Sequence, residues 1–286
     1  VLMMFYRAPG ELASELAEMD ECMPHYYKIT GNHGQGAETI MHAEAAFMQG
    51  RFTDAHIALE RAYAQIEGNG QENMALCCDF LARRLSLFTD IGQRARFEKR
   101  REQLLAHHNV SWLNLWNAAA AYHHALLGSL DRIPEAYRRH RLFTVRTLAP
   151  GKPMIEMIEN QVYLAQGEYA HVIGRSEGLL AQCEAMHYAL VALHIRIQTA
   201  AAYARLGKPE TAHTWLQKAL SDAGPDGLVM PFAENYSILK PLLARETRSA
   251  FAARITALGE AAQARGADRL RPAAFRALTA REFEIV

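Results

Sequence analysis

The chain has 286 residues, of which half are hydrophobic and 22% are charged, as is typical of a soluble folded protein. Lysine and arginine together number 31, as do aspartate and glutamate, so the formal net charge is zero. Nucleic-acid binding requires a basic surface, and the neutral balance therefore argues against DNA binding by the body of the chain.

The length and the cysteine content limit the architecture further. A chain of this size is near the upper limit for one compact core, which leaves two domains or an elongated repeat array. No apolar run approaches the roughly 20 residues that span a bilayer, so we expect no membrane segment. The start of the chain lacks a basic leader and a cleavage site, and we expect both ends to be cuts through a longer protein. Scattered cysteines predict no disulfide framework and a reducing cytoplasmic location: Cys22, Cys77, Cys78 and Cys183.

Glycines that follow helix-like apolar runs recur about every 40 residues, at Gly50, Gly92, Gly128, Gly167 and Gly207. A helix that ends at glycine and restarts within a few residues forms a helix hairpin. One hairpin cannot cover both of its apolar faces, so successive hairpins must stack. We therefore predict an all-α fold, a right-handed α-solenoid (superhelix) of tetratricopeptide-like helix hairpins with about 40 residues per repeat. The alternative is chance spacing of glycines in an alanine-rich helical protein.

The same register predicts the positions of the helices. The first helices of the hairpins are expected near residues 37–49, 74–90, 111–127, 154–166 and 186–206. The second helices are expected near 52–67, 94–108, 131–147, 169–184 and 209–222. Residues 200–212 give the clearest copy of the repeat, with the small, aromatic and glycine positions that resemble tetratricopeptide repeats. No alternating pattern predicts a strand.

After Leu220 the repeat stops. Gly224-Pro-Asp-Gly227 is a strong turn signal, and two shorter helices near 233–244 and 247–264 are expected to form the terminal cap that a solenoid requires. Residues 266–277 are rich in alanine and arginine and are predicted to be an interdomain linker. We therefore divide the chain into a repeat superhelix (1–222), capping helices (223–264), and a linker with the start of a further domain (265–286).

The last nine residues are Leu278-Thr-Ala-Arg-Glu-Phe-Glu-Ile-Val286. Thr279 and Glu282 have the spacing of a capping box, which predicts the start of a helix. The run resembles the start of the DNA-binding domain in LuxR-type transcriptional regulators, where Leu-Thr-x-Arg-Glu opens the first helix. A helix of so few residues is not stable alone in water, and we expect this segment to be frayed.

Together with the helical repeats and the segment Pro225–Phe232, this ending resembles the helical repeat domain of MalT-like regulators within the LuxR family. The resemblance implies a protein of three parts: an N-terminal P-loop module, the superhelix, and a C-terminal helix-turn-helix. The superhelix would receive a small-molecule inducer or a regulatory protein on its concave face and couple it to self-association. This chain departs from the pattern, because it has no phosphate-binding loop and its DNA reader is truncated. We therefore expect no cofactor, and DNA contact only through the missing C-terminal domain.

The repeat register also predicts a ligand site. Positions six residues before the glycines should face the concave surface, and two further polar residues lie along the same helices. Polar groups on an otherwise apolar concave wall are typical of a site for a small ligand or a peptide. The candidates are Glu44, Ser86, Asn114, Tyr122, Gln161 and His194.

Trp112 and Trp116 lie four residues apart on one helix, which is usual for core packing and is also compatible with a ligand platform. The adjacent histidine pairs lack metal-ligand spacing, and no nucleophile motif occurs, so we expect neither a metal site nor an enzyme. The leading hypothesis is a regulatory, effector- or partner-binding and oligomerisation domain of a bacterial LuxR-family regulator. The alternative is a tetratricopeptide-type scaffold that binds a peptide or protein in its concave groove.

Overall fold

The computed structural model of the chain describes residues 1–67, 70–90, 94–142, 149–246 and 248–270. Every regular element in these ranges is helical, which confirms the all-α prediction. None of the described helices is long and apolar enough to cross a lipid bilayer. The elements are α1 (Leu2–Phe5), α2 (Leu12–Thr30), α3 (Ala37–Met48), α4 (Phe52–Glu67), α5 (Glu72–Leu85), α6 (Arg94–Ala106), α7 (Val110–Leu126), η1 (Leu130–Arg132), α8 (Glu135–Arg138), η3 (Ala149–Gly151), α9 (Lys152–Gln166), α10 (Tyr169–Ala185), α11 (Ala189–Arg205), α12 (Pro209–Ala223), α13 (Met230–Glu234), α14 (Tyr236–Leu243) and α15 (Ala250–Leu270).

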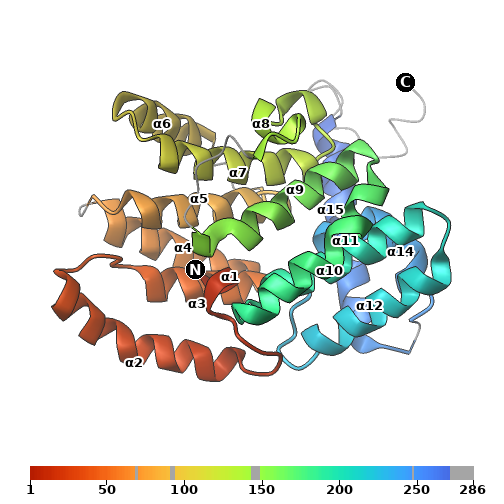
Figure 1. Cartoon of the computed structure of the whole chain (residues 1–286). Helices are drawn as coiled ribbons and strands as arrows, with labels where there is room; N and C mark the ends of the chain where they lie inside the picture. Colours follow the sequence, from red (N-terminus) through yellow and green to blue (C-terminus); the bar gives the residue numbers. More distant parts are fainter. Residues whose placement is uncertain (68–69, 91–93, 143–148, 247, 271–286) are drawn as a thin grey trace.

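The helices stack in the order of the chain (Figure 1). Helices α3, α5, α7, α9 and α11 each contact the next of this series and form one layer. The partners α4, α10 and α12 pack against them as the second helices of hairpins. Alanines at these helix interfaces are fully buried, as at Ala55 and Ala212, and allow close approach of the backbones. This arrangement matches the expected helical repeat, whereas the right-handed sense of the superhelix stays a prediction.

Glycines end the first helices at the positions that the spacing indicates. Gly50, Gly128, Gly167 and Gly207 have φ angles of 73°, 68°, 82° and 70°. This left-handed conformation costs glycine little because it has no Cβ, and it turns the chain into the second helix. Gly92, the fifth of the series, lies outside the described residues.

The second helix predicted at 131–147 is wrong. The chain there forms the single turns η1 and α8 instead. Pro134 explains the break, because the residue before a proline is driven out of the helical region, and Ile133 is extended with ψ of 128°. His140, with φ of 52°, follows α8 in the left-handed region. Residues 143–147 of the predicted helix lie outside the described residues.

The C-terminal boundaries also differ from prediction. The expected helix at 233–244 is two helices, α13 and α14, which meet at Asn235. Helix α15 runs past Gly266 to Leu270, so the linker predicted to start at residue 265 is helical over its first residues. The remainder of that linker and the segment Leu278–Val286 lie outside the described residues.

The N-terminal segment is tied to the C-terminal cap by Asp226. The carboxylate of Asp226 accepts hydrogen bonds from the hydroxyl of Tyr6 (2.6 Å) and from the backbone N–H groups of Gly10 (2.6 Å) and Leu12 (3.3 Å). Its backbone oxygen accepts from the side chain of Gln49 at 2.9 Å. The turn that interrupts the repeat therefore fixes the first helices against the last ones.

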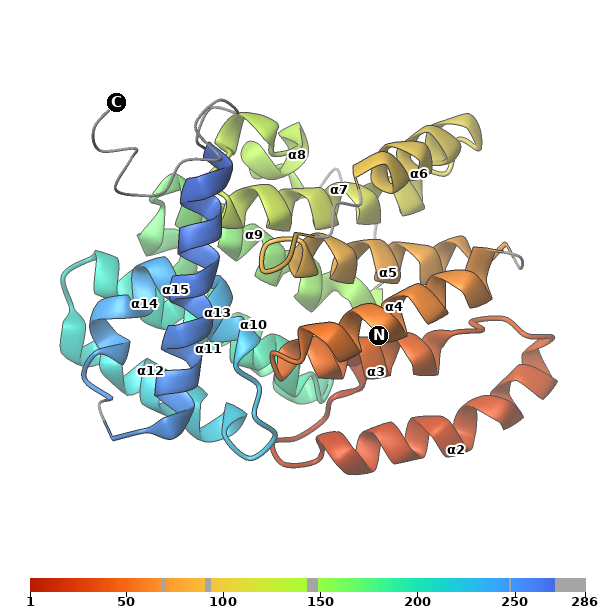
Figure 2. The ribbon, with the colours of Figure 1, turned by 180° about the vertical axis from the view of Figure 1, so that it is seen from behind.

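Helix α15 runs across the ends of the stacked helices (Figure 2). The guanidinium of Arg254 donates to the backbone oxygen of Gln49, and that of Arg265 donates to the oxygen of Phe88 at 2.5 Å. Both acceptors are carbonyls that follow the ends of first helices, where the helix itself leaves them unpaired. The last described helix is therefore fastened to the turns of two successive repeats.

The packing of α15 on α14 generates a stability prediction. A Cβ at Gly259 would lie 2.1 Å from the ring of Tyr236, which is buried. Gly259→Ala should therefore destabilise the fold by about 1–3 kcal/mol through overpacking, despite the better helix propensity of alanine. The matched control is Gly178→Ala on α10, where nothing lies within 4 Å; it should stabilise by about 0.5–1 kcal/mol. Urea unfolding of both variants tests this, and equal effects would contradict it.

Candidate functional site

The residues expected on the concave face lie on the inner layer of helices, but four of them are covered. Tyr122 and His194 are fully buried, and Glu44 and Gln161 are each 4% exposed. Ser86 and Asn114 are half-buried. The structure brings Tyr122 and His194 into contact, joins Tyr122 and Gln161 separately to the end of α13, and places Glu44 beside α1. Their role in ligand binding stays a prediction.

The centre of the inner surface is a buried ion pair between α5 and α13. The guanidinium of Arg84 donates to both carboxylate oxygens of Glu234, at 2.6 and 2.9 Å, and both side chains are almost completely buried. Burial alone would lower the pKa of Arg84, but the carboxylate of Glu234 outweighs it and raises that pKa. The guanidinium also lies over the rings of Phe47, Phe80 and Tyr122, at 5.0, 5.5 and 5.7 Å from their centroids. Arg84 is therefore a fixed cation.

Tyr122 connects this pair to α11. Its hydroxyl donates to Glu234 at 2.9 Å and lies 3.5 Å from Nδ1 of His194. Burial, reinforced by the positive charge of Arg84, lowers the pKa of His194 well below its ordinary value. His194 is therefore neutral at physiological pH, and its Nε2 has no hydrogen-bond partner within the described residues.

A second chain of hydrogen bonds joins α11, α9 and the end of α13. The side-chain amide of Gln198 donates to the side-chain oxygen of Gln161 at 3.1 Å. Gln161 in turn donates to Asn235 at 3.0 Å, and Asn235 donates to the backbone oxygen of Pro231 at 3.1 Å. The two networks hold α13 and the residue that follows it on the inner surface.

Toward the N-terminal end, the same inner surface contains a partly open apolar cavity of about 510 Å³, termed the chamber below. It lies between α1, α3, α5, α7 and α9, a volume in the range of ligand pockets. Polar groups reach it only at a few points, among them Glu44, Asn73, Asn109 and Ser111. Its apolar wall includes Met3, Met4, Leu76, Phe80, Trp112, Leu115, Met154 and Ile158.

The polar groups at the chamber are partly engaged already. Glu44 accepts hydrogen bonds from the nitrogen of Val1 at 3.2 Å and from the N–H of Leu2 at 2.5 Å, and so fixes the position of α1. Asn109 caps α7 by accepting from the N–H of Trp112 at 3.2 Å. The chamber therefore offers mainly dispersion and burial to a ligand, with few directional contacts.

The two tryptophans of α7 have different environments. Trp112 lines the chamber. The indole of Trp116 donates to the backbone oxygen of Phe97 at 3.2 Å and lies under the guanidinium of Arg83, which is 4.7 Å from its centroid. Trp116 is thus a packing residue between α6 and α7, and Trp112 belongs to the chamber wall.

Sequence reasoning missed the partners that define the inner surface. Arg84, Glu234, Asn235 and Gln198 were not among the predicted site residues. Their signal is a charged or amide group within or directly after an apolar run, because buried polar groups require partners. Arg84 lies within Phe80–Leu85, and Glu234 and Asn235 directly follow Val229–Ala233.

In the part of the chain that the structure describes, no cluster of three or more histidine, cysteine, aspartate or glutamate side chains could hold a metal ion. Comparison with known protein families and with curated proteins finds no match for this chain.

The Arg84–Glu234 pair generates a stability prediction. Glu234→Leu leaves the guanidinium buried without its counter-ion and should destabilise the fold by about 3–5 kcal/mol in urea unfolding. The double variant Arg84→Met, Glu234→Leu removes both charges and should recover most of that loss. If the double variant is as unstable as the single one, an unpaired charge is not the cause.

His194 generates a prediction of pH dependence. Its pKa is lower in the folded chain than the ordinary 6.5 of the unfolded chain, so the unfolded state takes up the proton first as the pH falls. The free energy of unfolding should therefore decrease below about pH 6.5, by up to about 1.4 kcal/mol per pH unit from this residue. His194→Gln should remove that part of the slope when unfolding is measured between pH 7 and 5. An unchanged slope in the variant would show that His194 does not contribute to it.

Proposed function

We propose that this chain is the regulatory, effector-binding part of a LuxR-family transcriptional regulator of the MalT-like kind. Three observations support the proposal: the stacked helix pairs, the segment Pro225–Phe232, and the ending Leu278-Thr-x-Arg-Glu. The observation that carries an effector role is the apolar chamber between the first helices of successive repeats. In this proposal the chain has no catalytic role, and the regulator contacts DNA only through a reader domain that follows it.

The chemistry of the chamber indicates the class of effector. A cavity of about 510 Å³ with an apolar wall and few polar groups fits a largely hydrophobic small molecule. Trp112 and Phe80 offer ring faces for stacking, and Asn73 and Ser111 offer isolated hydrogen bonds that would orient the ligand.

The contacts around the chamber provide a route to the C-terminal helices. Phe80 lies in the chamber wall, and its ring packs edge-on against Tyr122 with centroids 5.7 Å apart. Arg84, one turn along α5, lies above the same ring and holds Glu234. An effector that repositions Phe80 would therefore act on the ion pair that fixes α13, and α13 packs against α15.

A regulatory effect requires that the effector bind one arrangement of these helices better than another. In the proposed mechanism, the effector favours the arrangement in which α13 and α15 are placed for the active state of the regulator. An effector that binds both arrangements equally tightly would not shift the equilibrium between them.

The alternative function is a tetratricopeptide-type scaffold with a peptide in its concave groove. Helix α13 and its hydrogen bonds to Tyr122 and Gln161 cover the inner surface at α7, α9 and α11. An extended peptide along the whole groove is thus disfavoured. The coding sequence that follows Val286 discriminates between the two functions. A basic helix-turn-helix there favours the regulator, and a stop codon or an unrelated domain favours the scaffold.

Ligand binding in the chamber can be tested with the neutral apolar dye N-phenyl-1-naphthylamine, whose fluorescence rises when it leaves water. Leu115→Trp places a larger side chain in the chamber wall and should weaken dye binding by about tenfold or more. Leu127→Trp is the matched control, because Leu127 is 49% exposed and does not line the chamber. Dye affinity that is equal in the wild type and in Leu115→Trp would contradict the proposed site.

A further inference from the structure

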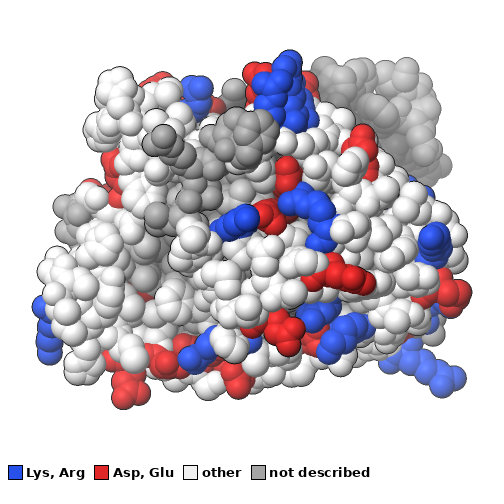
Figure 3. Space-filling model, in the orientation of Figure 1, with Lys and Arg blue, Asp and Glu red and all other residues white. Residues whose placement is uncertain are grey.

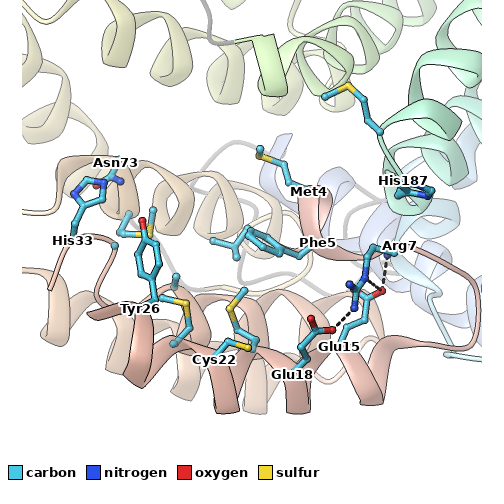
Figure 4. A pocket seen from close by; sticks show the side chains of 17 residues that line it. Met4, Phe5, Arg7, Glu15, Glu18, Cys22, Tyr26, His33, Asn73 and His187 are labelled. Atoms are coloured by element: carbon cyan, nitrogen blue, oxygen red, sulfur yellow. Dashed lines mark hydrogen bonds and ion pairs between the residues drawn. The ribbon is translucent and has the colours of Figure 1, made fainter. Parts of the chain in front are cut away.

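A second hollow lies outside the inner surface, alongside α2. Helix α2 packs mainly against α3, and a groove of about 620 Å³ separates its other side from α1, the start of α5 and the turn after α10. Figure 4 shows the groove with Glu18, Cys22 and Tyr26 of α2 on one wall and Phe5 and His187 opposite them. The groove and the effector chamber share Val1, Met4 and Asn73, and their other lining residues are different.

Methionine dominates the apolar surface of this groove. Of the 11 methionines in the chain, five line it: Met4, Met19, Met23, Met74 and Met186. Methionine side chains are unbranched and polarisable, so they adapt to partners of different shape and are over-used at surfaces that bind other proteins.

The groove also exposes large apolar side chains to solvent. Phe5 is 51% exposed and Tyr26 is 43% exposed, although both are hydrophobic residues at the groove. Ile29 lies three residues after Tyr26, so it continues the same face of α2, and it is 85% exposed. Ile29 does not line the groove itself, but exposed apolar side chains gathered at and beside a groove are typical of an interaction site.

The charges beside the groove are mainly negative. The charged side chains that line it are the carboxylates of Glu15 and Glu18 and the guanidinium of Arg7. Arg7 is engaged with Glu15 and Glu18, so two carboxylates face one guanidinium at that end of the groove. Acidic side chains gather along the edge of the molecule that α2 forms (Figure 3). A partner that combines apolar and basic groups would complement this surface.

We propose that the groove along α2 binds a basic amphipathic helix of a partner protein. An amphipathic helix places apolar residues at positions i, i+3, i+4 and i+7 into an apolar groove and leaves its basic residues at the rim. The 19 residues of α2 span about 28 Å, which gives a partner helix of several turns a wall to lie against. The length of α2 and the excess of carboxylate over guanidinium at the groove favour such a helix over a small apolar molecule.

The test uses a fluorescein-labelled 18-residue probe peptide with leucine at i, i+3, i+4 and i+7 and lysine elsewhere. Binding to the whole chain is measured by fluorescence anisotropy. A peptide with the same leucines and glutamate in place of lysine tests the charge requirement, and a scrambled leucine and lysine peptide tests the need for an amphipathic face. The probe should bind at least about tenfold more tightly than either control.

Paired substitutions locate the binding surface. Tyr26→Ser with Ile29→Ser should weaken binding of the probe by about tenfold or more, because two exposed apolar contacts are lost. The matched control is Ile57→Ser with Leu127→Ser, which removes apolar side chains of similar exposure (55% and 49%) elsewhere. Circular dichroism checks that both variants keep the fold.

The thiol of Cys22 supplies an independent readout, since it lines the groove and is exposed, whereas Cys78 and Cys183 are buried. The probe should slow alkylation of Cys22 by iodoacetamide, as followed by mass spectrometry. The proposal is overturned if the Tyr26 and Ile29 variant binds like the wild type, or if the acidic peptide binds as tightly. It is also overturned if dodecyltrimethylammonium below its micelle concentration protects Cys22 and the peptide does not, which would make the groove a small-molecule site. Failure here is distinguishable from failure of the proposed effector site, because Cys22 and Tyr26 line only the groove and Leu115 lines only the chamber.

Discussion

The buried charge of Arg84 is the constraint on which the inner surface of this fold depends. A guanidinium on the inner layer of helices cannot be left without water and without a counter-ion, because the cost of burying it alone is several kcal/mol. Glu234 meets that requirement only if the segment after the repeats folds back into the superhelix. The ion pair, the hydroxyl of Tyr122 and the amides of Gln161 and Asn235 together hold α13 there. The cap of this protein is therefore a part of its core and does more than cover the last repeat.

This folding back divides the inner surface into two regions of different character. Under α13 the surface is polar, filled and connected by hydrogen bonds. Toward the N-terminal end it is apolar and hollow, with α1 as one wall of the chamber. Phe80 belongs to both regions, because its ring faces the chamber and also contacts Tyr122. The proposed effector site therefore adjoins the hydrogen-bonded network that holds α13.

The glycine spacing was sufficient to predict the helix hairpins, because a left-handed turn at Gly50, Gly128, Gly167 or Gly207 is a local requirement that glycine alone meets at low cost. The helix predicted at 131–147 is wrong because Pro134 forces Ile133 out of the helical conformation, and this local steric effect prevails over the repeat spacing. The inner-surface positions were predicted from the register. Of the six, Tyr122 contacts His194, and Gln161 bonds to Asn235, the residue after the partner of Tyr122. That they lie beneath α13 could not be predicted, because the contact between Tyr122 and Glu234 spans 112 residues and no periodic pattern encodes it.

The hydrogen bonds of Asp226 have a consequence for how cooperatively the described helices unfold. In a repeat array with free ends, each repeat contacts only its neighbours, so the terminal repeats can unfold without the others. Here the carboxylate of Asp226 joins the first turns to the segment after the last repeat, and Ala189 also donates to the backbone oxygen of Tyr6 at 3.0 Å. The first and the last repeats that the structure describes are thereby joined directly. An array joined in this way should unfold as one unit, so a change that destabilises the first helices should also destabilise the last ones.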